Sequence, residues 1–430
     1  MSNVIKKQLC ACIYLYQKCA VKNFNDHSIV SEKPAELAKY YCNNGSDRII
    51  VFDLSNNDFE QEEALDIIKE IALASEVPVI GAGNIERVEN VKKLLYAGCS
   101  KAILNFKKDN NIALAEEVSK RFGKDKIAAS YSDKTEIVDN IELINNYISE
   151  LICVNEEIIE ECSTLSSVPS ICCIKNDNDN KFIELIKSDG ISGITGSYIN
   201  DNIERIFGIK LDLAEQKLPV SICEAKYKWS DLKLNSDGML PVVVQDYRTN
   251  EVLQVAYMNE TAYLKTLELG KMTYWSRSRN ELWTKGETSG HFQYVKSLTV
   301  DCDYDTMLAK VAQVGAACHT GRYSCFFNTV LEKEYNDTNP LKVFENVYNV
   351  ISDRKQNPKE GSYTNYLFDK GLDKILKKLG EEATEIVIAA KNPNTNEIKY
   401  EISDFLYHMM VLMVEKNISW NEIMTELSNR

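Results

Sequence analysis

Three aspartates alternate with other residues in the stretch D-C-D-Y-D, at positions 301, 303 and 305. In a β-strand, side chains alternate between the two faces, so the pattern predicts three carboxylates on one face and Cys302 on the other. Like charges in such proximity repel, and burying them unpaired is costly. A hard cation that prefers oxygen ligands, such as Mg²⁺, resolves that repulsion. Asp301, Asp303 and Asp305 are therefore candidate Mg²⁺ ligands.

Three cysteines and a histidine occupy the same short region. Cys302 lies among the aspartates, and Cys318, His319 and Cys325 follow in C-H-T-G-R-Y-S-C. Thiolate and imidazole are ligands that suit Zn²⁺. Three protein ligands leave a fourth position open, which is typical of catalytic zinc. The simpler alternative is that an isolated cysteine such as Cys302 is a small core residue.

Two further segments carry groups suited to phosphate. In Y-W-S-R-S-R, Trp275 is followed by Arg277 and Arg279, and a pair of guanidinium groups can form a fork around phosphate. The segment L-W-T-K-G-E-T-S-G-H is polar and rich in glycine, like loops that bind anions. The alternative for both is a pair of charged surface hairpins. The candidate substrate ligands in the second segment are Lys285, Thr288 and Ser289.

Carboxylates also cluster on two expected helices near the end of the chain. Like charges at i and i+4 destabilise a helix unless something positive lies beside them, and antiparallel helices can present carboxylates to a shared cation. The alternative is the solvated faces of two amphipathic helices. The candidate Mg²⁺ ligands are Glu381, Glu382, Glu385, Glu401 and Asp404. The lysines that could neutralise phosphate charge are Lys374, Lys377, Lys378 and Lys391.

The elements that must position these residues differ between the two regions. Residues 239–258 read as a β-hairpin, and Asn259 and Gly270 are the expected N-cap and stop of a following helix. From residue 341 onward the apolar spacing is helical, with strong helices over 370–391 and 398–414. The central region is therefore predicted to be an α+β metal-binding domain, and the last region an all-α domain.

The first half of the chain alternates short apolar strands with amphipathic helices. Strands are expected at 49–52, 77–80, 101–104 and 191–194, with others between them. About eight strands in about 210 residues favour a (β/α)₈ barrel, and the alternative is a doubly wound open sheet. The predicted domains are 1–213, 214–335 and 336–430, with a polar linker at 336–340.

Composition narrows the possible functions. The chain has 430 residues, a formal net charge of −14 and thirteen cysteines. The negative charge argues against nucleic-acid or membrane binding, and no apolar run is long enough for a transmembrane helix. The cysteines show no spacing of a small secreted domain, and no signal peptide pattern is present, so we expect a cytoplasmic protein.

The central motifs resemble those of phosphoribosyl-AMP cyclohydrolase, which opens the purine ring by adding water. The match runs in order from Y-M-N-E through Y-W-S-R-S-R, L-W-T-K-G-E-T-S-G-H and V-D-C-D-Y-D to C-H-T-G-R-Y-S-C-F-F. It implies Zn²⁺ on Cys302, Cys318 and Cys325, with cysteines from two subunits and hence a homodimer. It also implies Mg²⁺ on the three aspartates. Zinc lowers the pKa of bound water to about 7, and His319 or His291 would serve as general base or acid.

The C-terminal motifs are similar to those of phosphoribosyl-ATP pyrophosphohydrolase, an all-α family. They include G-L-D-K-I-L-K-K-L-G-E-E-A-T-E and E-I-S-D-F-L-Y-H. The resemblance implies that the E-E-x-x-E and E-x-x-D motifs hold Mg²⁺, with Glu382 and Glu385 in catalytic roles and Lys378 and Lys391 near the phosphates. The two resemblances together predict a bifunctional hydrolase of histidine biosynthesis that acts on phosphoribosyl nucleotides derived from ATP.

The first region resembles the histidine-biosynthesis barrels, through V-P-V-I-G-A-G-N-I-E-R-V and G-I-S-G-I-T-G-S. Those barrels carry an aspartate on strand 1 and another on strand 5. Here Tyr14 replaces the first, and residues 129–131 contain no aspartate. Without both carboxylates the family's proton transfer is lost, so we expect a non-catalytic barrel. The alternative role is a module that binds a ligand or acts as a scaffold for other enzymes of the pathway.

Overall fold

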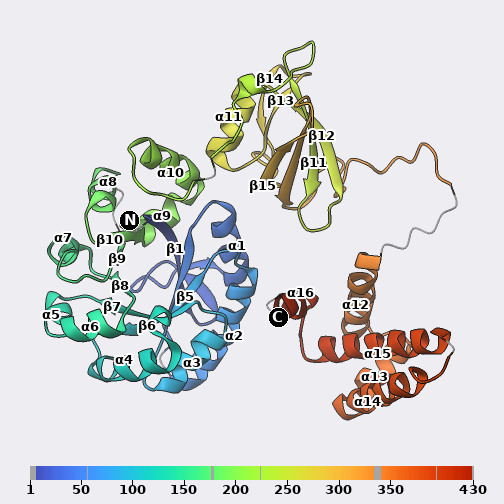
Figure 1. Ribbon diagram of the computed structural model, residues 1–430, viewed down its shortest axis with the longest axis horizontal. Coiled ribbons are helices and arrows are strands. Elements are labelled where there is room, and N and C mark those ends of the chain that lie inside the picture. Colours follow the sequence, from blue (N-terminus) through green and yellow to red (C-terminus); the bar gives the residue numbers. More distant parts are fainter. Residues whose placement is uncertain are drawn as a thin grey trace. The chain divides into compact units, whose positions relative to one another are not determined.

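The computed structural model describes residues 6–55, 57–175, 179–222, 224–333, 340–393 and 395–428. It divides into two compact units, residues 1–328 and 329–430. The first unit contains a barrel followed by a smaller sheet domain, and the second unit is helical (Figure 1). Residues 336–339 of the predicted linker at 336–340 lie outside the described residues, as does residue 394. No helix among the described residues is long and apolar enough to span a membrane.

Eight parallel strands form a closed barrel in the first unit. Closure occurs where β1 (Gln8–Tyr16) pairs with β10 (Ile191–Thr195), with Gln8 opposite Gly193 and Leu9 opposite Ile194. The prediction of a (β/α)₈ barrel is therefore confirmed, because an open doubly wound sheet would leave its two edges unpaired. The intervening strands are β4 (Arg48–Asp53), β5 (Val79–Ala82), β6 (Lys101–Asn105), β7 (Ile127–Tyr131), β8 (Glu150–Cys153) and β9 (Ser170–Cys173).

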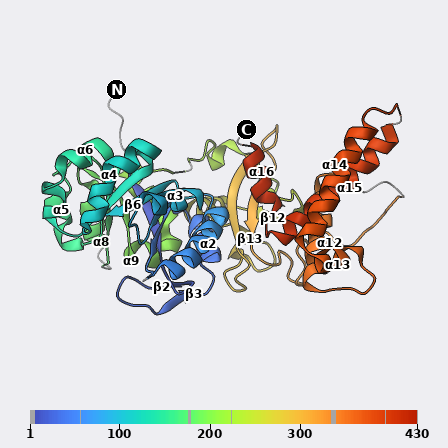
Figure 2. The same ribbon diagram turned by 90° about the horizontal axis from the view of Figure 1, so that it is seen from below.

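Helices surround these strands, as Figures 1 and 2 show. A short antiparallel hairpin, β2 (Cys19–Val21) and β3 (Ile29–Ser31), extends β1 beyond the barrel. The helices are α1 (Pro34–Asn43), α2 (Asp58–Ala74), α3 (Val88–Tyr96), α4 (Asp109–Phe122), α5 (Lys134–Val138), α6 (Ile141–Tyr147), α7 (Ile159–Cys162), α8 (Asp179–Lys187), α9 (Ser197–Asp201) and α10 (Ile206–Glu215).

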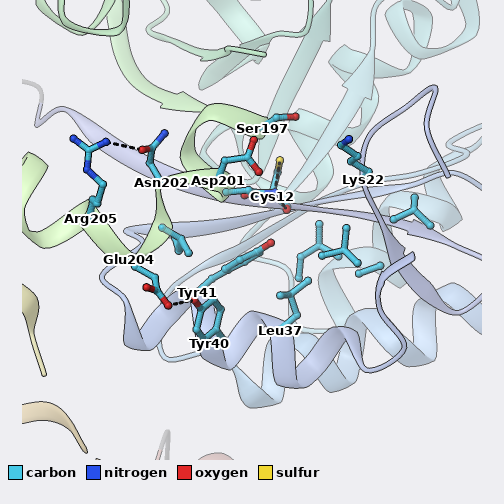
Figure 3. A pocket seen from close by; sticks show the side chains of 16 residues that line it. Cys12, Lys22, Leu37, Tyr40, Tyr41, Ser197, Asp201, Asn202, Glu204 and Arg205 are labelled. Carbon is cyan, nitrogen blue, oxygen red and sulfur yellow. Dashed lines mark hydrogen bonds between the residues drawn. The ribbon is translucent and has the colours of Figure 1, made fainter. Parts of the chain in front are cut away.

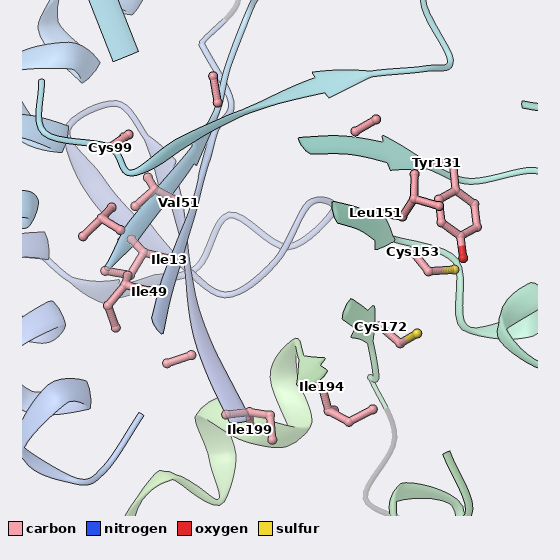
Figure 4. Packing of buried hydrophobic residues seen from close by; sticks show 14 of the residues in the cluster. Ile13, Ile49, Val51, Cys99, Tyr131, Leu151, Cys153, Cys172, Ile194 and Ile199 are labelled. Atoms are coloured by element: carbon pink, nitrogen blue, oxygen red, sulfur yellow. The ribbon is translucent and has the colours of Figure 1, made fainter. Parts of the chain in front are cut away.

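The barrel has two apolar layers because its strands are buried on both faces. The outer layer packs between strands and helices and includes Ile13, Val51 and Ile194 (Figure 4). The inner layer fills the barrel and includes Cys12 and Tyr14, the neighbours of Ile13 on the same strand. This alternation along β1 follows from the two-residue period of a strand.

The sheet domain is built on four strands in the order β12-β11-β16-β15. Burial alternates strictly along β11, so one face packs on the core and the other meets solvent. The predicted hairpin is confirmed, as are the side-chain cap of Asn259 on the following helix and Gly270 at its end, with φ +63. The elements are β11 (Leu240–Asp246), β12 (Val252–Met258), α11 (Glu260–Leu269), β13 (Thr273–Ser276), β14 (Glu281–Thr284), β15 (Gln293–Val300) and β16 (Met307–Gln313).

The second unit consists of helices, as predicted. The two helices that carry the carboxylate motifs, α14 and α15, lie side by side (Figure 2). A buried cluster that includes Ile351, Leu367, Ile375 and Val411 joins four of the helices. The helices are α12 (Pro340–Gln356), α13 (Tyr363–Lys370), α14 (Leu372–Ala389), α15 (Thr395–Glu415) and α16 (Trp420–Ser428).

Candidate active sites

The three aspartates of the central domain lie in a turn, so the prediction of a strand at 301–305 is wrong. β15 ends at Val300 and β16 begins at Met307, and the chain must reverse direction between them. The reversal places Tyr304 in the left-handed region, with φ +67. The D-C-D-Y-D sequence therefore has the two-residue period of a strand, but its residues form a turn.

The turn nevertheless brings the carboxylates together. One oxygen from each of Asp301, Asp303 and Asp305 lies within 4.8 Å of the others, and all three side chains are exposed. Asp301 Oδ1 accepts hydrogen bonds from the backbone N–H of Asp305 (3.1 Å) and of Thr306 (3.2 Å). Desolvation raises the pKa of Asp301, but these hydrogen bonds outweigh it and hold that pKa below its ordinary value. The hydrogen bonds therefore favour the charged form of Asp301 within this group of carboxylates.

Two of the three predicted zinc ligands are neighbours on a second loop of this domain. Cys318 and Cys325 interact through their thiols, and Thr320 donates a hydrogen bond to Cys318 Sγ at 3.1 Å. That hydrogen bond is the main cause of the lowered pKa of Cys318, whereas burial raises the pKa of Cys325. Within one chain, Cys302 does not join these two thiols: it is exposed in the aspartate turn, and the described residues form no three-thiol group.

A cavity of about 390 Å³ opens beside the two thiols. Cys325 and His319 line it, and His319 Nδ1 lies 3.9 Å from the sulfur of Cys318. His291 is not among the lining residues; its ring packs against Gly315. Of the two predicted histidines, His319 is therefore the one beside the thiols. The other residues that line the cavity are Gln254, Val255, Ala256, Trp283, Lys285, Ala317 and Phe326.

Lys285 is the predicted phosphate ligand that the fold buries most deeply. Its side chain donates a hydrogen bond to the carbonyl of Ala317, and its ammonium lies 5.5 Å from the centre of the Trp283 ring. Burial is the main cause of its lowered pKa, and the nearby thiols Cys318 and Cys325 oppose that shift. The lysine thus brings a positive charge to the two predicted zinc ligands.

The other predicted phosphate ligands lie apart from Lys285. Arg277 and Arg279 belong to the turn between β13 and β14; the first stacks on Tyr257 at 3.9 Å and the second pairs with Glu281 at 3.2 Å. Trp275 is half-buried in β13, while Thr288 and Ser289 are exposed in the next turn. Sequence reasoning missed Gln254, Trp283 and Phe326; the last two adjoin residues of the motifs, which was the available signal.

The second carboxylate cluster lies between α14 and α15. One oxygen from each of Glu382, Glu401 and Asp404 lies within 4.8 Å of the others. Glu382 is buried at 5% exposure. Glu401 also contacts Glu385, and desolvation together with this contact raises the pKa of Glu401. A carboxyl that holds its proton against a like charge is the arrangement that a divalent cation relieves.

The predicted lysines divide into two groups. Lys378 pairs with Glu381 at 3.1 Å and with Glu382 at 3.4 Å, whereas Lys377 pairs with Glu381 at 3.5 Å. The hydrogen bond from Lys378 is the main cause of the lowered pKa of Glu381. Glu381 therefore turns toward lysines, outside the group of three. Lys391 is exposed just beyond the end of α14.

Sequence reasoning missed two residues at this cluster, His408 and Tyr363. The Nδ1 atom of His408 lies 3.7 Å from Glu382 Oε1, and its Nε2 atom lies 3.2 Å from the Tyr363 hydroxyl. A signal was present, because His408 follows Asp404 by four residues and so shares its helix face.

The mouth of the barrel is filled by aromatic rings. Tyr14 lies 4.8 Å from Phe24 and 5.4 Å from Phe52 between ring centres, and Phe24 lies 4.9 Å from Phe52. Asp53 follows at the end of β4, where it accepts hydrogen bonds from Ser55 while its Oδ2 atom is buried without a partner. Burial raises the pKa of Asp53.

The barrel and the sheet domain contact one another within the first unit. Glu76 accepts hydrogen bonds from Lys296 (2.5 Å) and Tyr247 (2.6 Å) of the sheet domain. The ring of Phe207, on α10, lies so near Gly45 and Gly270 that a Cβ atom would come within 3.0 Å and 2.5 Å of it, respectively. Glu76 precedes β5, so these contacts lie at the face opposite the strands' C-terminal ends.

A hollow of about 470 Å³ lies at the side of the barrel, between α1 and the segment after β10 (Figure 3). Ser197, Asp201 and Lys22 point into its polar part, while Leu37 lines an apolar part. On its rim Tyr40 donates a hydrogen bond to Glu204 at 2.7 Å. Ser197 belongs to the segment G-I-S-G-I-T-G-S, through which the chain resembles the histidine-biosynthesis barrels.

Three family models match the chain, one for each predicted region. They are "Histidine biosynthesis protein" over residues 8–150, "Phosphoribosyl-AMP cyclohydrolase" over 254–327 and "Phosphoribosyl-ATP pyrophosphohydrolase" over 344–430. The first supports the relation of the barrel to the histidine-biosynthesis barrels. The other two support the resemblances of the central and C-terminal motifs.

Curated relatives match the last two regions together. The "Histidine biosynthesis bifunctional protein HisIE" of Thermoanaerobacter pseudethanolicus is 54% identical over 209 residues, which are 46% of this chain and 97% of the relative. The protein of the same name from Bacillus subtilis is 46% identical over 200 residues, 46% of this chain and 95% of the relative. Since nearly the whole of these relatives is matched, the chain belongs to the family of bifunctional histidine-biosynthesis enzymes HisIE, with cyclohydrolase and pyrophosphohydrolase domains and an additional barrel.

Proposed function

We propose that the helical unit releases pyrophosphate from phosphoribosyl-ATP and that the sheet domain then opens the adenine ring of the product, phosphoribosyl-AMP. The observation that carries this proposal is the presence of two separate acidic clusters, each in the domain whose family model names one of the two reactions. The reactions run along the chain in the reverse of their chemical order.

In the helical unit, the fit to Mg²⁺ follows from the donor set. Glu382, Glu401 and Asp404 offer oxygen ligands that converge within 4.8 Å, which is the chemistry that Mg²⁺ prefers. Bound Mg²⁺ would neutralise charge on the triphosphate and lower the pKa of water. Glu385, which contacts Glu401, would accept a proton from the attacking water. Lys378 would move from Glu382 toward phosphate as the cation takes its place.

In the sheet domain, Asp301, Asp303 and Asp305 form a second oxygen-donor set that suits Mg²⁺ and would place the substrate's phosphate or ribose. Cys318 and Cys325 suit Zn²⁺, which when bound supplies an acidified water near neutral pH. His319 lines the cavity beside them and would take the proton from water or protonate a ring nitrogen. Lys285 holds the cysteine loop through the carbonyl of Ala317.

The third zinc ligand would come from a second copy of the chain. Cys302 is exposed in the aspartate turn and stands apart from the other two thiols. Two thiols alone leave zinc short of the three protein ligands usual at a catalytic site. We therefore propose a homodimer in which Cys302 of one copy completes the site of the other.

Product analysis of two single variants tests the proposed function. Glu382→Gln should abolish pyrophosphate release from phosphoribosyl-ATP and leave ring opening of added phosphoribosyl-AMP intact. Cys318→Ser should abolish ring opening and leave pyrophosphate release intact, so that phosphoribosyl-AMP accumulates. The site assignments fail if either variant keeps the reaction assigned to its domain while it remains folded.

We propose that the barrel is non-catalytic and serves as a support for the sheet domain. The aromatic rings at its mouth occupy the place where a substrate would meet the missing carboxylates. The face of the barrel at the N-terminal ends of the strands contributes mainly to stability in such folds. On this face, Glu76 and Asn43 accept hydrogen bonds from Lys296 of the sheet domain. If Phe207→Ala leaves the thermal stability of the sheet domain unchanged, the support role is wrong.

The hollow at the side of the barrel favours a second candidate role, the binding of a small polar ligand. A volume of about 470 Å³ is in the range of small-molecule pockets. The test is calorimetric titration of the full chain with phosphorylated intermediates of the pathway, alongside a Ser197→Ala variant. The absence of binding at millimolar ligand would contradict this role.

A further inference from the structure

His408 contacts two of the predicted metal ligands in the helical unit, and its role rests on the function proposed for that unit. The side chain is 4% exposed on α15. Its Nδ1 atom lies 2.9 Å from the backbone carbonyl of Asp404 and 3.7 Å from Glu382 Oε1. Its Nε2 atom lies 3.2 Å from the hydroxyl of Tyr363 at the start of α13. One ring thus joins three helices at the edge of the carboxylate group.

The hydrogen-bond partners assign the protons of a neutral imidazole. A backbone carbonyl can only accept, so Nδ1 must carry the hydrogen and donate it. Nε2 is then the acceptor, and the Tyr363 hydroxyl donates to it. The Nδ1–H donates to the carbonyl of Asp404, and Glu382 Oε1 lies beside the ring at 3.7 Å, outside hydrogen-bond distance. The hydrogen bonds therefore run from Tyr363 through His408 to the backbone of Asp404.

Glu382, the carboxylate beside the ring, is the most buried of the three converging carboxylates. It is 5% exposed, and its Oε1 atom is also within 3.4 Å of Lys378. The lysine is 29% exposed and can leave when a cation arrives, whereas the histidine is packed in place. A ring that is held at both nitrogens limits where the neighbouring carboxylate can turn. Groups of this kind around metal ligands typically change metal affinity 10- to 100-fold when they are lost.

We propose that His408 is a positioning residue of the pyrophosphohydrolase site. Its ring, which hydrogen-bonds to the carbonyl of Asp404 and to Tyr363, anchors the Asp404 turn of α15 and packs beside Glu382. Both carboxylates are thereby kept in the geometry that a divalent cation requires.

Two amide substitutions separate the two ring nitrogens. His408→Asn keeps an N–H near the position of Nδ1 and loses the group that faces Tyr363, whereas His408→Gln extends past the position of Nδ1 toward Nε2. Tyr363→Phe removes only the hydroxyl from a half-exposed ring. Tyr400→Phe is the matched control, because Tyr400 is 72% exposed on the same helix as His408.

The readout is Mn²⁺ binding to the metal-free full chain by calorimetry, at the site that Glu382→Gln removes. We expect His408→Gln to weaken Mn²⁺ at that site about tenfold. His408→Asn should retain affinity within about threefold, Tyr363→Phe should lose about threefold, and Tyr400→Phe should match the wild type. In activity, His408→Gln should raise the Mg²⁺ concentration for half-maximal pyrophosphate release, with kcat largely restored at saturation.

A packing role alone predicts a different pattern. Equal Mn²⁺ affinities for His408→Asn, His408→Gln and the wild type, with only a lower Tm, would overturn the positioning role. If His408→Gln does not fold, an unchanged Mn²⁺ affinity in Tyr363→Phe would overturn it instead. If Glu382→Gln removes no Mn²⁺ site, the function proposed for this unit fails before the question of His408 arises.

Discussion

At the scale of residues, the sheet domain depends on a lysine that the fold buries beside two thiols. Lys285 is buried and donates a hydrogen bond to the carbonyl of Ala317. Its ammonium also lies near the thiols of Cys318 and Cys325. Its charge favours thiolate over thiol at both cysteines. Lys285 therefore stabilises the cysteine loop and also favours the charged thiolates that bind a cation.

Replacing Lys285 by methionine should reduce ring opening strongly. The change keeps all but the last atom of the side chain and removes a hydrogen bond that a charged group donates to the carbonyl of Ala317. Such a bond is worth about 1.5–3 kcal/mol, so kcat/KM should fall roughly 10- to 150-fold. Pyrophosphate release by the same sample provides an internal control, and Lys265→Met on α11, whose lysine is exposed, is the matched variant. A wild-type rate of ring opening in Lys285→Met would remove this lysine from the site.

The sequence predicted the chemistry of these residues better than their geometry. The carboxylates of both clusters could be chosen from spacing, because like charges at short intervals need a cation to share a site. The spacing of His408 from Asp404 places both on one helix face, but nothing in the sequence indicates the contact of His408 with Tyr363 on another helix. Glu381 shows the opposite case: its spacing fits the motif, yet its carboxylate pairs with Lys377 and Lys378, outside the group of three.

At the scale of elements, turns and helix ends place the functional groups. The β15–β16 turn brings three aspartates together because Tyr304 adopts a positive φ, which the alternating sequence does not reveal. The barrel strands and the helix α11 could be predicted to within a few residues, because hydrophobic period and capping residues act locally. The contacts among Tyr14, Phe24 and Phe52 could not be predicted, since they join two strands and a loop that are separated in sequence.

The end of α11 offers a sharp test of the contact between barrel and sheet domain. Gly270 has φ +63, and a Cβ atom there would meet the Phe207 ring at 2.5 Å. Gly270→Ala should therefore reduce the free energy of unfolding of the first unit by about 2 kcal/mol, through backbone strain and a clash. Denaturant unfolding of the full chain measures this.

Gly208→Ala is the matched control for that experiment. Gly208 lies in the helix α10, next to Phe207, and a Cβ atom there would meet nothing within 4 Å. The substitution should be neutral or stabilise by up to about 1 kcal/mol. Equal losses for both alanines would mean that the Phe207 contact does not matter.

At the scale of the whole molecule, acid should weaken the attachment of the sheet domain to the barrel. Desolvation raises the pKa of Glu76, but hydrogen bonds from Lys296 and Tyr247 outweigh it, and the pKa is lowered. A folded-state pKa below the unfolded value adds stability above the unfolded pKa, and this stability is lost as pH falls through the folded pKa. Because Glu76 is more than one-third exposed, the effect should stay under about 1 kcal/mol.

The variant Glu76→Gln isolates this pH dependence. It should be less stable than the wild type at pH 7, and the difference should shrink as the pH drops below the ordinary range of glutamate. Urea unfolding at a series of pH values measures both. A stability difference that stays constant with pH would show that the charge of Glu76 is not the cause.

The proposed dimer predicts that two inactive variants can restore one another. Cys302→Ser and Cys318→Ser each remove ring opening, because each copy would supply one part of the shared zinc site. After mixing under conditions that exchange subunits, half of the dimers should be mixed and hold one intact site, giving about one quarter of the wild-type rate. No recovery, with exchange shown by mass spectrometry, would place all three thiols outside a shared site.

The most direct measurement concerns the claim that one chain carries two independent hydrolase sites. Phosphoribosyl-ATP is given to Glu382→Gln alone, to Cys318→Ser alone and to an equal mixture, and ³¹P NMR together with the ultraviolet spectrum follows the products. We predict no turnover in the first sample, phosphoribosyl-AMP and pyrophosphate in the second, and the ring-opened product in the mixture. Ring-opened product from either variant alone, or none from the mixture of folded variants, would contradict the account.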